Sequence, residues 1–163
     1  MTIEVGQPAP DFTLKDQNNE EFTLYEQRGR RAVLVVFYPF AFTGICTGEL
    51  CAIRDEKSVF AGEGVVTVTV SCDTPYAHKV FDERERFGFP LLSDFWPHGE
   101  VAQRYGVFND EGGFAYRGTF LVDVDGIVRF TEVNGPGQGR DPQAWRDAIA
   151  ALGATPVGPH AAL

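Results

Sequence analysis

The sequence has 163 residues, 44% of them hydrophobic, and a formal net charge of −9. This length suits one domain with a substantial core, so we expect residues 1–163 to form a single domain. An acidic chain with scattered basic residues repels phosphate backbones and anionic lipids, which makes nucleic acid and membranes poor partners. No positively charged start precedes an apolar segment, and the three cysteines are an odd number; both features suggest a cytoplasmic protein without a disulfide framework.

The first part of the sequence predicts a hairpin, a buried strand and a helix. Residues 11–14 and 21–24 alternate around a polar turn, as in a β-hairpin. Residues 31–40 are rich in β-branched and aromatic side chains, which is typical of a strand covered on both faces and ended by Pro39. Residues 44–60 should then form a helix with apolar side chains on one face and charges on the other.

The middle of the sequence repeats this alternation. Residues 64–73 predict a second buried strand, which follows the helix-ending glycines at 62 and 64. Residues 73–88 predict a helix capped by Asp73 or Thr74 and ended by Gly88. Residues 89–108 contain few periodic features and read as loop.

The last part predicts a second hairpin and a closing helix. Residues 116–134 should form two strands that turn at Asp125 and Gly126, on the antiparallel side of the sheet. Residues 140–153 predict a helix capped by Asp141, and the tail from about 154 to 163 should be frayed. The order of elements indicates an α/β fold of the thioredoxin-like type, with a mixed central sheet flanked by helices and an N-terminal β-hairpin.

Cys46 occupies the expected first turn of a helix that follows a buried strand. Free N–H groups and the positive end of the helix dipole favour a thiolate at such a position. Pro39 and Thr43 precede Cys46 by seven and three residues, so a rigid ring, a hydroxyl and a thiol converge on one helix entrance. Taken singly, each residue is also compatible with ordinary packing, strand ending or helix capping.

The segment PFAFTGIC resembles the active-site pattern of peroxiredoxins, in which a proline, a threonine and the peroxidatic cysteine follow at these spacings. Glu49 and Arg117 match further positions of that family, and the similarity extends from about residue 4 to 153. The resemblance implies a thiol peroxidase that needs no cofactor and no metal. Cys46 would attack a hydroperoxide, either hydrogen peroxide or an organic one, and become a sulfenic acid.

The same resemblance suggests roles for the neighbouring polar residues. Thr43, Arg117 and the N–H groups of the first helical turn are suited to stabilising charge on the departing oxygen. Arg117 precedes a strand that looks buried, so its charge needs a partner. Glu49 either orients Arg117 through a bidentate pair or is a helix-surface charge.

Cys51 leaves two mechanisms open. The body of the chain resembles the alkyl hydroperoxidase E subfamily, whose members commonly use the peroxidatic cysteine alone, but Q-type peroxiredoxins carry a resolving cysteine at this five-residue spacing. On an intact helix the two Cα atoms would be about 8.7 Å apart, whereas a disulfide needs less than about 7 Å, so the helix would have to unwind. In the alternative mechanism an external thiol reacts with the oxidised Cys46, and Cys51 is an inert residue that only packs on the side of the helix. Cys72 is expected to be a buried strand-end thiol, with an alternative role as resolver.

Three other functions are less compatible with the sequence. The spacings of the candidate metal ligands match no familiar zinc pattern; these are Cys46, Cys51, Cys72, His78 and His98. His78 reads as an exposed helix residue and His98 as a loop residue near a helix start. A disulfide reductase would need a Cys-x-x-Cys motif, which the sequence lacks.

A chaperone-like interaction protein is suggested only by the aromatic residues Phe95, Trp96 and Phe108, which could instead line a dimer contact or the substrate mouth. For the peroxidase, the expected partners are a hydroperoxide and a reductant such as thioredoxin or a glutaredoxin-like protein, for example mycoredoxin. A homodimer is a further possibility suggested by the subfamily.

Overall fold

The computed structural model describes residues 2–56, 64–135 and 138–154. The strands are β1 (Thr13–Lys15), β2 (Glu21–Thr23), β3 (Ala32–Phe37), β4 (Val65–Ser71), β5 (Leu91–Ser93), β6 (Phe108–Asn109), β7 (Phe114–Ala115), β8 (Arg117–Val122) and β9 (Val128–Asn134). The helices are η1 (Leu24–Gln27, a 3-10 helix), α1 (Gly44–Asp55), α3 (Pro75–Glu85), α4 (Glu100–Arg104) and α5 (Pro142–Ala154).

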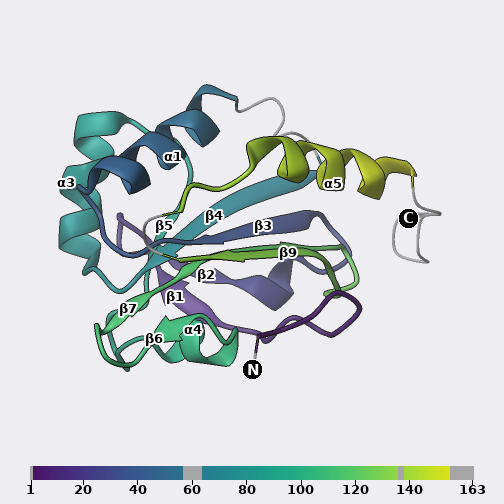
Figure 1. Ribbon diagram of the computed structural model, residues 1–163, viewed down its shortest axis with the longest axis horizontal. Helices are drawn as coiled ribbons and strands as arrows, with labels where there is room; N and C mark the ends of the chain where they lie inside the picture. Colours follow the sequence, from purple (N-terminus) through teal and green to yellow (C-terminus); the bar gives the residue numbers. More distant parts are fainter. Residues whose placement is uncertain (1, 57–63, 136–137, 155–163) are drawn as a thin grey trace.

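Seven strands form one mixed sheet in the order β2-β1-β5-β4-β3-β8-β9 (Figure 1). β3 lies near the centre, parallel to β4 and antiparallel to β8. All six residues of β3 and all six of β8 are buried, because the sheet is covered on both faces. The apolar run that predicted a doubly covered strand is therefore β3, and the thioredoxin-like α/β fold is confirmed.

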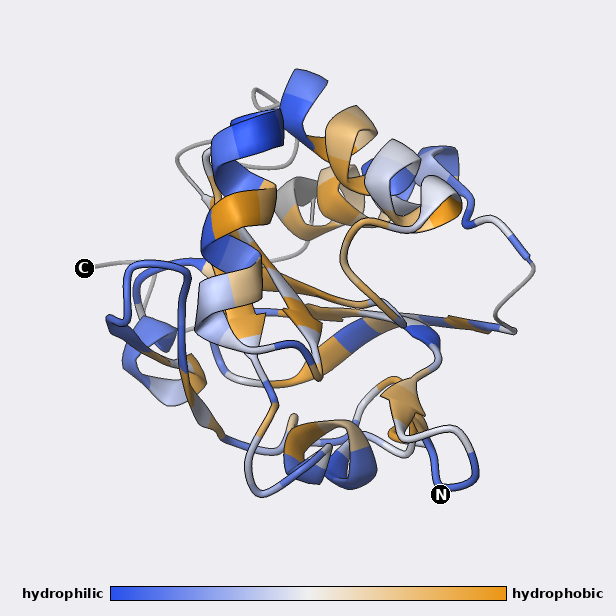
Figure 2. Cartoon of the chain, turned by 90° about the vertical axis from the view of Figure 1, so that its left-hand side faces the viewer, coloured by the Kyte–Doolittle hydropathy of each residue, from blue (hydrophilic) through white to orange (hydrophobic). Residues whose placement is uncertain are grey.

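Helices cover the two faces of the sheet unequally. α1, α3 and α5 lie on one face, and α4 lies on the other (Figure 1). On the first face Leu34 and Val36 of β3 belong to the same buried cluster as Leu50 of α1. The alternate residues of β3 join the second cluster, in which α4 takes part. Figure 2 shows hydrophobic residues concentrated on the central strands and on the helix segments that face them. Because successive side chains of β3 point to opposite faces of the sheet, this strand contributes residues to both hydrophobic clusters.

Most predicted element boundaries agree with the structure, with three exceptions. α1 ends at Asp55, with Glu56 as its C-cap residue, before the predicted end at residue 60. Thr74 caps α3 by accepting a hydrogen bond from the N–H of Ala77 at 3.2 Å, but the helix ends at Glu85. Arg86, with φ of 52°, is the left-handed residue at the helix end, two residues before the predicted stop at Gly88. The segment predicted as loop contains β5 and α4, two elements of five residues or fewer that carry little periodicity. Residues 57–63, with the expected helix end at Gly62, and the tail 155–163 lie outside the described residues.

The prediction that His78 is exposed is wrong. Its side chain is 0% exposed and faces the sheet, where Nε2 lies 2.7 Å from the hydroxyl of Ser71 and 3.2 Å from that of Tyr38. The signal was present in the sequence, because His78 and Phe81 are three residues apart and share the inner face of α3. Charged neighbours such as Lys79 obscured it.

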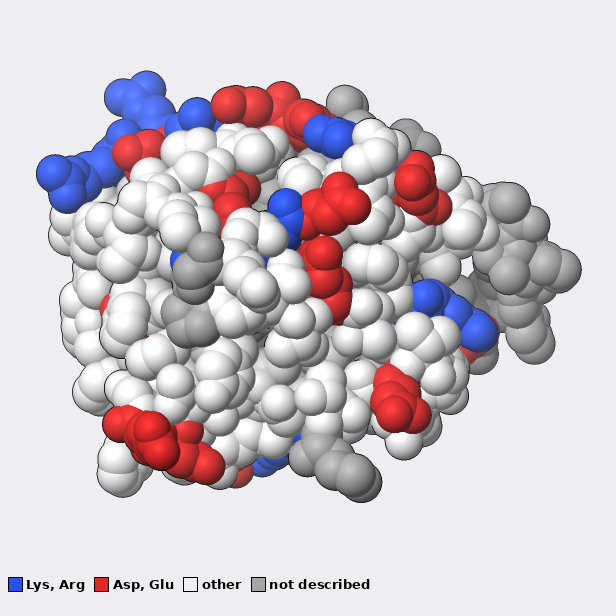
Figure 3. Space-filling view, in the orientation of Figure 1, with Lys and Arg blue, Asp and Glu red and all other residues white. Residues whose placement is uncertain are grey.

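The surface carries charge in small groups. On the face shown in Figure 3, acidic and basic side chains alternate in small, separate clusters. No helix in the described part of the chain is long and apolar enough to span a bilayer.

Candidate functional site

The candidate site lies where β3 passes into α1. Cys46 is in the first turn of α1, and its side chain is completely buried. Thr43 is the N-cap residue, with extended backbone angles of −81° and 152°. The first turn is closed by a hydrogen bond from the N–H of Thr47 to the carbonyl of Thr43. The sulfur therefore lies at the helix entrance that the sequence predicted, where the helix dipole is positive.

A depression of about 280 Å³ opens beside the cysteine. It is lined by Pro39, Phe40, Thr43, Gly44, Ile45, Phe114 and Arg117. The hydroxyl of Thr43 donates to the carbonyl of Phe40 at 2.9 Å, so it turns away from the helix N–H groups in this structure. The structure brings Pro39, Thr43 and Arg117 to one mouth, as the sequence predicted. Phe95, Trp96 and Phe108, for which the sequence left a dimer contact or the substrate mouth open, do not line it; Phe40 and Phe114 do.

Arg117 connects the cysteine to Glu49. Its Nη2 donates to the sulfur of Cys46 at 3.3 Å, and its Nη1 donates to Oε1 of Glu49 at 2.5 Å. Arg117 is only 3% exposed, because β8 lies beside β3 in the interior of the sheet. Glu49, whose side chain is 13% exposed, is therefore not a surface charge but a half-buried partner of Arg117.

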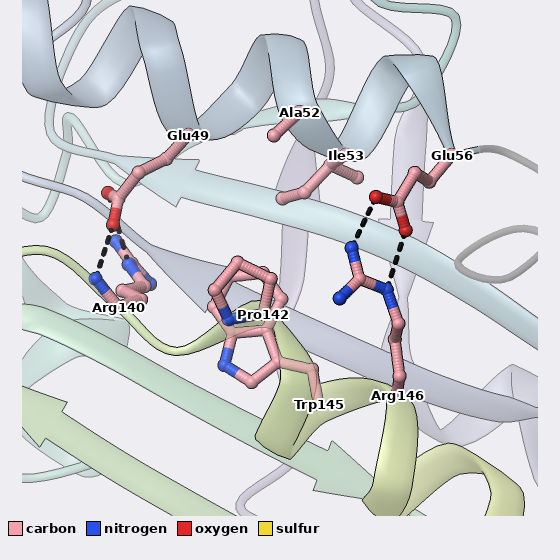
Figure 4. Close-up of a pocket in the computed structure, with 8 residues that line it drawn as sticks. All are labelled: Glu49, Ala52, Ile53, Glu56, Arg140, Pro142, Trp145 and Arg146. Carbon is pink, nitrogen blue, oxygen red and sulfur yellow. Dashed lines mark hydrogen bonds and ion pairs between the residues drawn. The ribbon is translucent and has the colours of Figure 1, made fainter.

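Arg140 is a second buried arginine at the site, and the sequence analysis missed it. Its backbone N–H donates to Oε2 of Glu49 at 3.0 Å and its Nε to Oε1 at 3.2 Å (Figure 4). The guanidinium also donates to Thr119 Oγ1 at 3.0 Å and to the carbonyls of Gly118 and Phe37. Burial lowers the pKa of Arg140 to about 10, against the raising effect of Glu49. No periodicity marks this residue, which precedes the cap of α5 in an irregular segment.

These contacts set the charge balance around the sulfur. Arg117 and Arg140 carry two positive charges, and Glu49 supplies one negative charge. Cys46 therefore lies beside a cluster in which the basic groups outnumber the acidic one.

The loop before α1, residues 40–43, is held by hydrogen bonds to side chains in and just after β4. Phe42 has φ of 69°, a strained value for a residue with an aromatic side chain. The N–H of the preceding Ala41 donates to Oδ2 of Asp73 at 2.9 Å, and the same oxygen accepts from the hydroxyl of Ser71 at 2.7 Å. Ser71 in turn contacts His78, whose pKa burial lowers to about 4. This polar cluster therefore connects α3 and β4 to the backbone of the loop before α1.

The other two cysteines lie in different surroundings. Cys51 is half-buried on α1, and its thiol donates to Oε2 of Glu85 on α3 at 3.4 Å. Burial and the Glu85 carboxylate raise the pKa of Cys51. Cys72 is buried directly after β4, as expected, and burial together with Asp94 raises its pKa to about 12. All three cysteines are free, with α1 unbroken between Cys46 and Cys51.

The five candidate metal ligands do not converge. His78 is bound within its polar cluster, and His98 lies just before α4 with its ring nitrogens against the carbonyls of Phe95 and Gly113. Over residues 2–56, 64–135 and 138–154, no group of three or more His, Cys, Asp or Glu side chains is arranged to hold a metal ion.

Comparison with known proteins relates most of the chain to one family. The family model described as AhpC/TSA family matches residues 5–131. Alkyl hydroperoxide reductase E of Mycobacterium tuberculosis is 52% identical over 150 residues, covering 92% of this chain and 98% of the relative. Peroxiredoxin-2 of Rattus norvegicus is 35% identical over 140 residues, covering 80% of this chain and 69% of the relative.

Solved structures agree with these matches. The reduced 2-Cys peroxiredoxin of Plasmodium vivax superposes with a TM-score of 0.84 at 27% identity, over 93% of this chain and 83% of that chain. Peroxidoxin BcpB from Mycobacterium tuberculosis superposes with a TM-score of 0.79 at 33% identity, over 95% of this chain and 99% of that chain. The range matched by the family model, residues 5–131, includes Cys46, Glu49 and Arg117.

Proposed function

From the premise that this chain belongs to the AhpC/TSA family and is a peroxiredoxin, a thiol peroxidase, we propose that Cys46 reduces the hydroperoxide and Cys51 resolves the product. The observation that carries the first half is the contact of 3.3 Å between Arg117 Nη2 and the sulfur of Cys46. A cation at this distance supports the proposal, because the reacting sulfur and the departing oxygen both need stabilisation.

In the first half-reaction the Cys46 thiolate attacks the terminal oxygen of the hydroperoxide. The sulfur–oxygen bond forms as the oxygen–oxygen bond breaks, and the remaining oxygen leaves with the electron pair. That oxygen takes up a proton and departs as water or an alcohol, while Cys46 becomes a sulfenic acid. Arg117 stabilises the charge, Thr43 can rotate its hydroxyl toward the peroxide, and Pro39 shields the sulfur from water.

The lining of the mouth supports organic hydroperoxides as substrates beside hydrogen peroxide. The rings of Phe40 and Phe114 stand 5.1 Å apart at their centroids, and Ile45 adds a further exposed apolar side chain. An alkyl chain that leaves water for this surface gains affinity in proportion to the area it buries. Hydrogen peroxide gains nothing from the same surface.

In the second half-reaction the thiol of Cys51 attacks the sulfenic acid. A five-residue separation on an intact helix places the Cα atoms about 8.7 Å apart, beyond the reach of a disulfide, so the first turn of α1 unwinds. An alternative is a one-cysteine cycle, in which an external thiol attacks Cys46. The half-buried position of Cys51 on an unbroken helix favours that alternative as long as the helix stays folded.

The proposed function also leads us to expect a particular class of reductant, a cellular compartment and an oligomeric state. We expect the oxidised enzyme to be reduced by thioredoxin or by a glutaredoxin-like protein such as mycoredoxin; a relative from Fasciola hepatica is named thioredoxin peroxidase. The three free cysteines suit a reducing cytoplasm. Seven strands drawn from residues 13–134 form one sheet, which supports a single domain. Family membership also leads us to propose a homodimer.

Mass spectrometry after one equivalent of hydrogen peroxide tests this cycle. The reduced protein is treated, free thiols are blocked, and intact and peptide masses are measured. The two-cysteine cycle predicts the loss of two hydrogens and a link between Cys46 and Cys51. A gain of oxygen on Cys46 alone establishes the one-cysteine cycle. Cys46→Ser should abolish both products, and Cys72→Ser should leave the wild-type product unchanged.

A further inference from the structure

The side chain of Cys51 is paired with a carboxylate on the neighbouring helix. Its thiol donates to Oε2 of Glu85, 34 residues further along the chain, at 3.4 Å. Cys51 Sγ and Glu85 Oε2 come from different elements, α1 and α3, so chain proximity does not explain the contact. A thiol aimed at a carboxylate has an acceptor in place for its proton.

Arg54 holds that carboxylate in position. Its Nη1 donates to the backbone carbonyl of Glu85 at 2.6 Å and lies 3.8 Å from Oε2 of the same residue. Arg54 is one turn from Cys51 on α1, so the second half of this helix is fastened to the end of α3 at two neighbouring points. The first turn, with Cys46, can unwind while Cys51 and Glu85 stay in contact.

We propose that Glu85 is the catalytic base of the resolving step, which accepts the proton of Cys51 as that sulfur attacks Cys46. The proposal rests on the two-cysteine cycle proposed above. The Cys51 sulfur forms a bond to the Cys46 sulfur, the sulfur–oxygen bond of the sulfenic acid breaks, and the hydroxide leaves with the electron pair. The proton passes from Cys51 to the Glu85 carboxylate and then to solvent, and the hydroxide takes up a proton to become water.

The carboxylate has two opposing effects on Cys51, and they separate the possible roles. Its negative charge, together with burial, raises the pKa of the Cys51 thiol and so lowers the population of free thiolate. If Cys51 reacts only as a thiolate formed beforehand, removal of the charge accelerates the resolving step near neutral pH. If Glu85 takes the proton during the attack, removal of the carboxylate slows that step. The two roles predict changes of opposite sign.

The test compares Glu85→Gln with Glu83→Gln, a matched change at an exposed position of the same helix. After a pulse of hydrogen peroxide, rapid quenching with a thiol-blocking reagent and peptide mass spectrometry follow the closure of the disulfide. At pH 7 we expect closure to slow about a hundredfold in Glu85→Gln, and the loss to shrink as the pH rises and solvent hydroxide replaces the base. Glu83→Gln should close at the wild-type rate, and the initial reaction of Cys46 should be unchanged in both.

A second variant tests whether slow disulfide closure results from loss of the base or from a change in structure. Glu85→Ala should also close slowly, and added formate should restore part of the rate, because a small carboxylate can occupy the space and accept the proton. Faster or unchanged closure in Glu85→Gln, or slow closure without rescue by formate, would overturn the role of Glu85. If the wild type forms no link between Cys46 and Cys51, the two-cysteine cycle itself is wrong.

Discussion

The guanidinium of Arg117 donates a hydrogen bond to the sulfur of Cys46 at 3.3 Å, although 71 residues separate the two in the sequence. The contact joins the first turn of α1 to the beginning of β8, which is paired with β3 in the interior of the sheet. The position of the cation relative to the sulfur is therefore fixed by the sheet rather than by a flexible side chain.

Replacement of this arginine by lysine should impair peroxide reduction while the fold persists. Lysine keeps the charge, but its ammonium cannot serve Glu49 and Cys46 with the spacing of a planar guanidinium. We expect the rate constant of Arg117→Lys with hydrogen peroxide to fall about 10-fold to 1,000-fold, in the range of lost transition-state donors. Stopped-flow measurement checks this. Arg129→Lys, at an exposed ion pair with Asp123, is the control and should react normally.

Neutralisation of Glu49 should cost stability as well as activity. In Glu49→Gln the guanidinium groups of Arg117 and Arg140 stay buried without their carboxylate, and breaking a buried pair in this way costs about 3–5 kcal/mol. Urea unfolding at pH 7 measures the loss. Glu56→Gln provides the comparison, because it removes a solvent-accessible pair with Arg146 from the same helix (Figure 4). Equal losses in the two variants would contradict the account of the site.

The sequence predicted the parts of the site that are local in the chain. Pro39, Thr43 and Cys46 fall within eight residues, so the strand end, the cap and the first helical turn place them together without long-range information. The partnership of Glu49 with Arg117 came from resemblance to a family rather than from periodicity. Arg140 could not be found in either way, because its contacts are with residues 21 to 103 positions away in the chain.

The errors elsewhere have similar causes. β5 and α4 were missed because short elements depend on their neighbours in the sheet and on the carboxylate of Asp94, which accepts from the N–H groups of Val101 and Ala102. His78 was predicted to be exposed because α3 contains many charged residues, and a single apolar residue three positions later was too weak a sign of burial. The long buried strands β3 and β8 were correct, since their composition alone marks them as interior.

Removal of the carboxylate of Asp73 should loosen the loop before α1, residues 40–43. Asp73→Ala deletes the acceptor that holds the N–H of Ala41 next to the strained Phe42, so the loop can relax away from its functional shape. We expect faster amide hydrogen exchange in residues 40–43 and a peroxide rate about tenfold lower, from the sensitivity of catalysis to small misplacements. Asp110→Ala, at an exposed position, is the control. Unchanged exchange in Asp73→Ala would show that the strain is held by other contacts.

His78 should make the protein less stable in acid. Burial lowers its pKa from 6.5 to about 4, so the unfolded chain binds a proton between these values and the folded protein does not. Stability therefore falls as the pH drops through this window, by about 3 kcal/mol for a shift of this size. The comparison of His78→Gln with the wild type, by urea unfolding at pH 7 and pH 4.5, should show a smaller acid loss in the variant.

Asp94 should act in the opposite direction over almost the same range. Burial raises its pKa from 3.8 to about 6, so the folded protein holds a proton that the unfolded chain has released. Stability from this group rises as the pH falls from about 6 to 4. Asp94→Asn should therefore lose more stability in acid than the wild type, whereas His78→Gln loses less. If both variants shift in the same direction, one of the two assignments is wrong.

The participation of Arg140 also bears on the order in which the site is completed during synthesis. Glu49 and Arg140 are 91 residues apart, and a ribosome adding roughly 5–20 residues per second needs about 5 to 18 seconds to cover that interval. During this time the nascent chain contains Cys46 but lacks Arg140, and for most of the interval it lacks Arg117 as well. The hydrogen bonds from both arginines to Glu49 can therefore form only when synthesis has passed residue 140, within the last quarter of the chain.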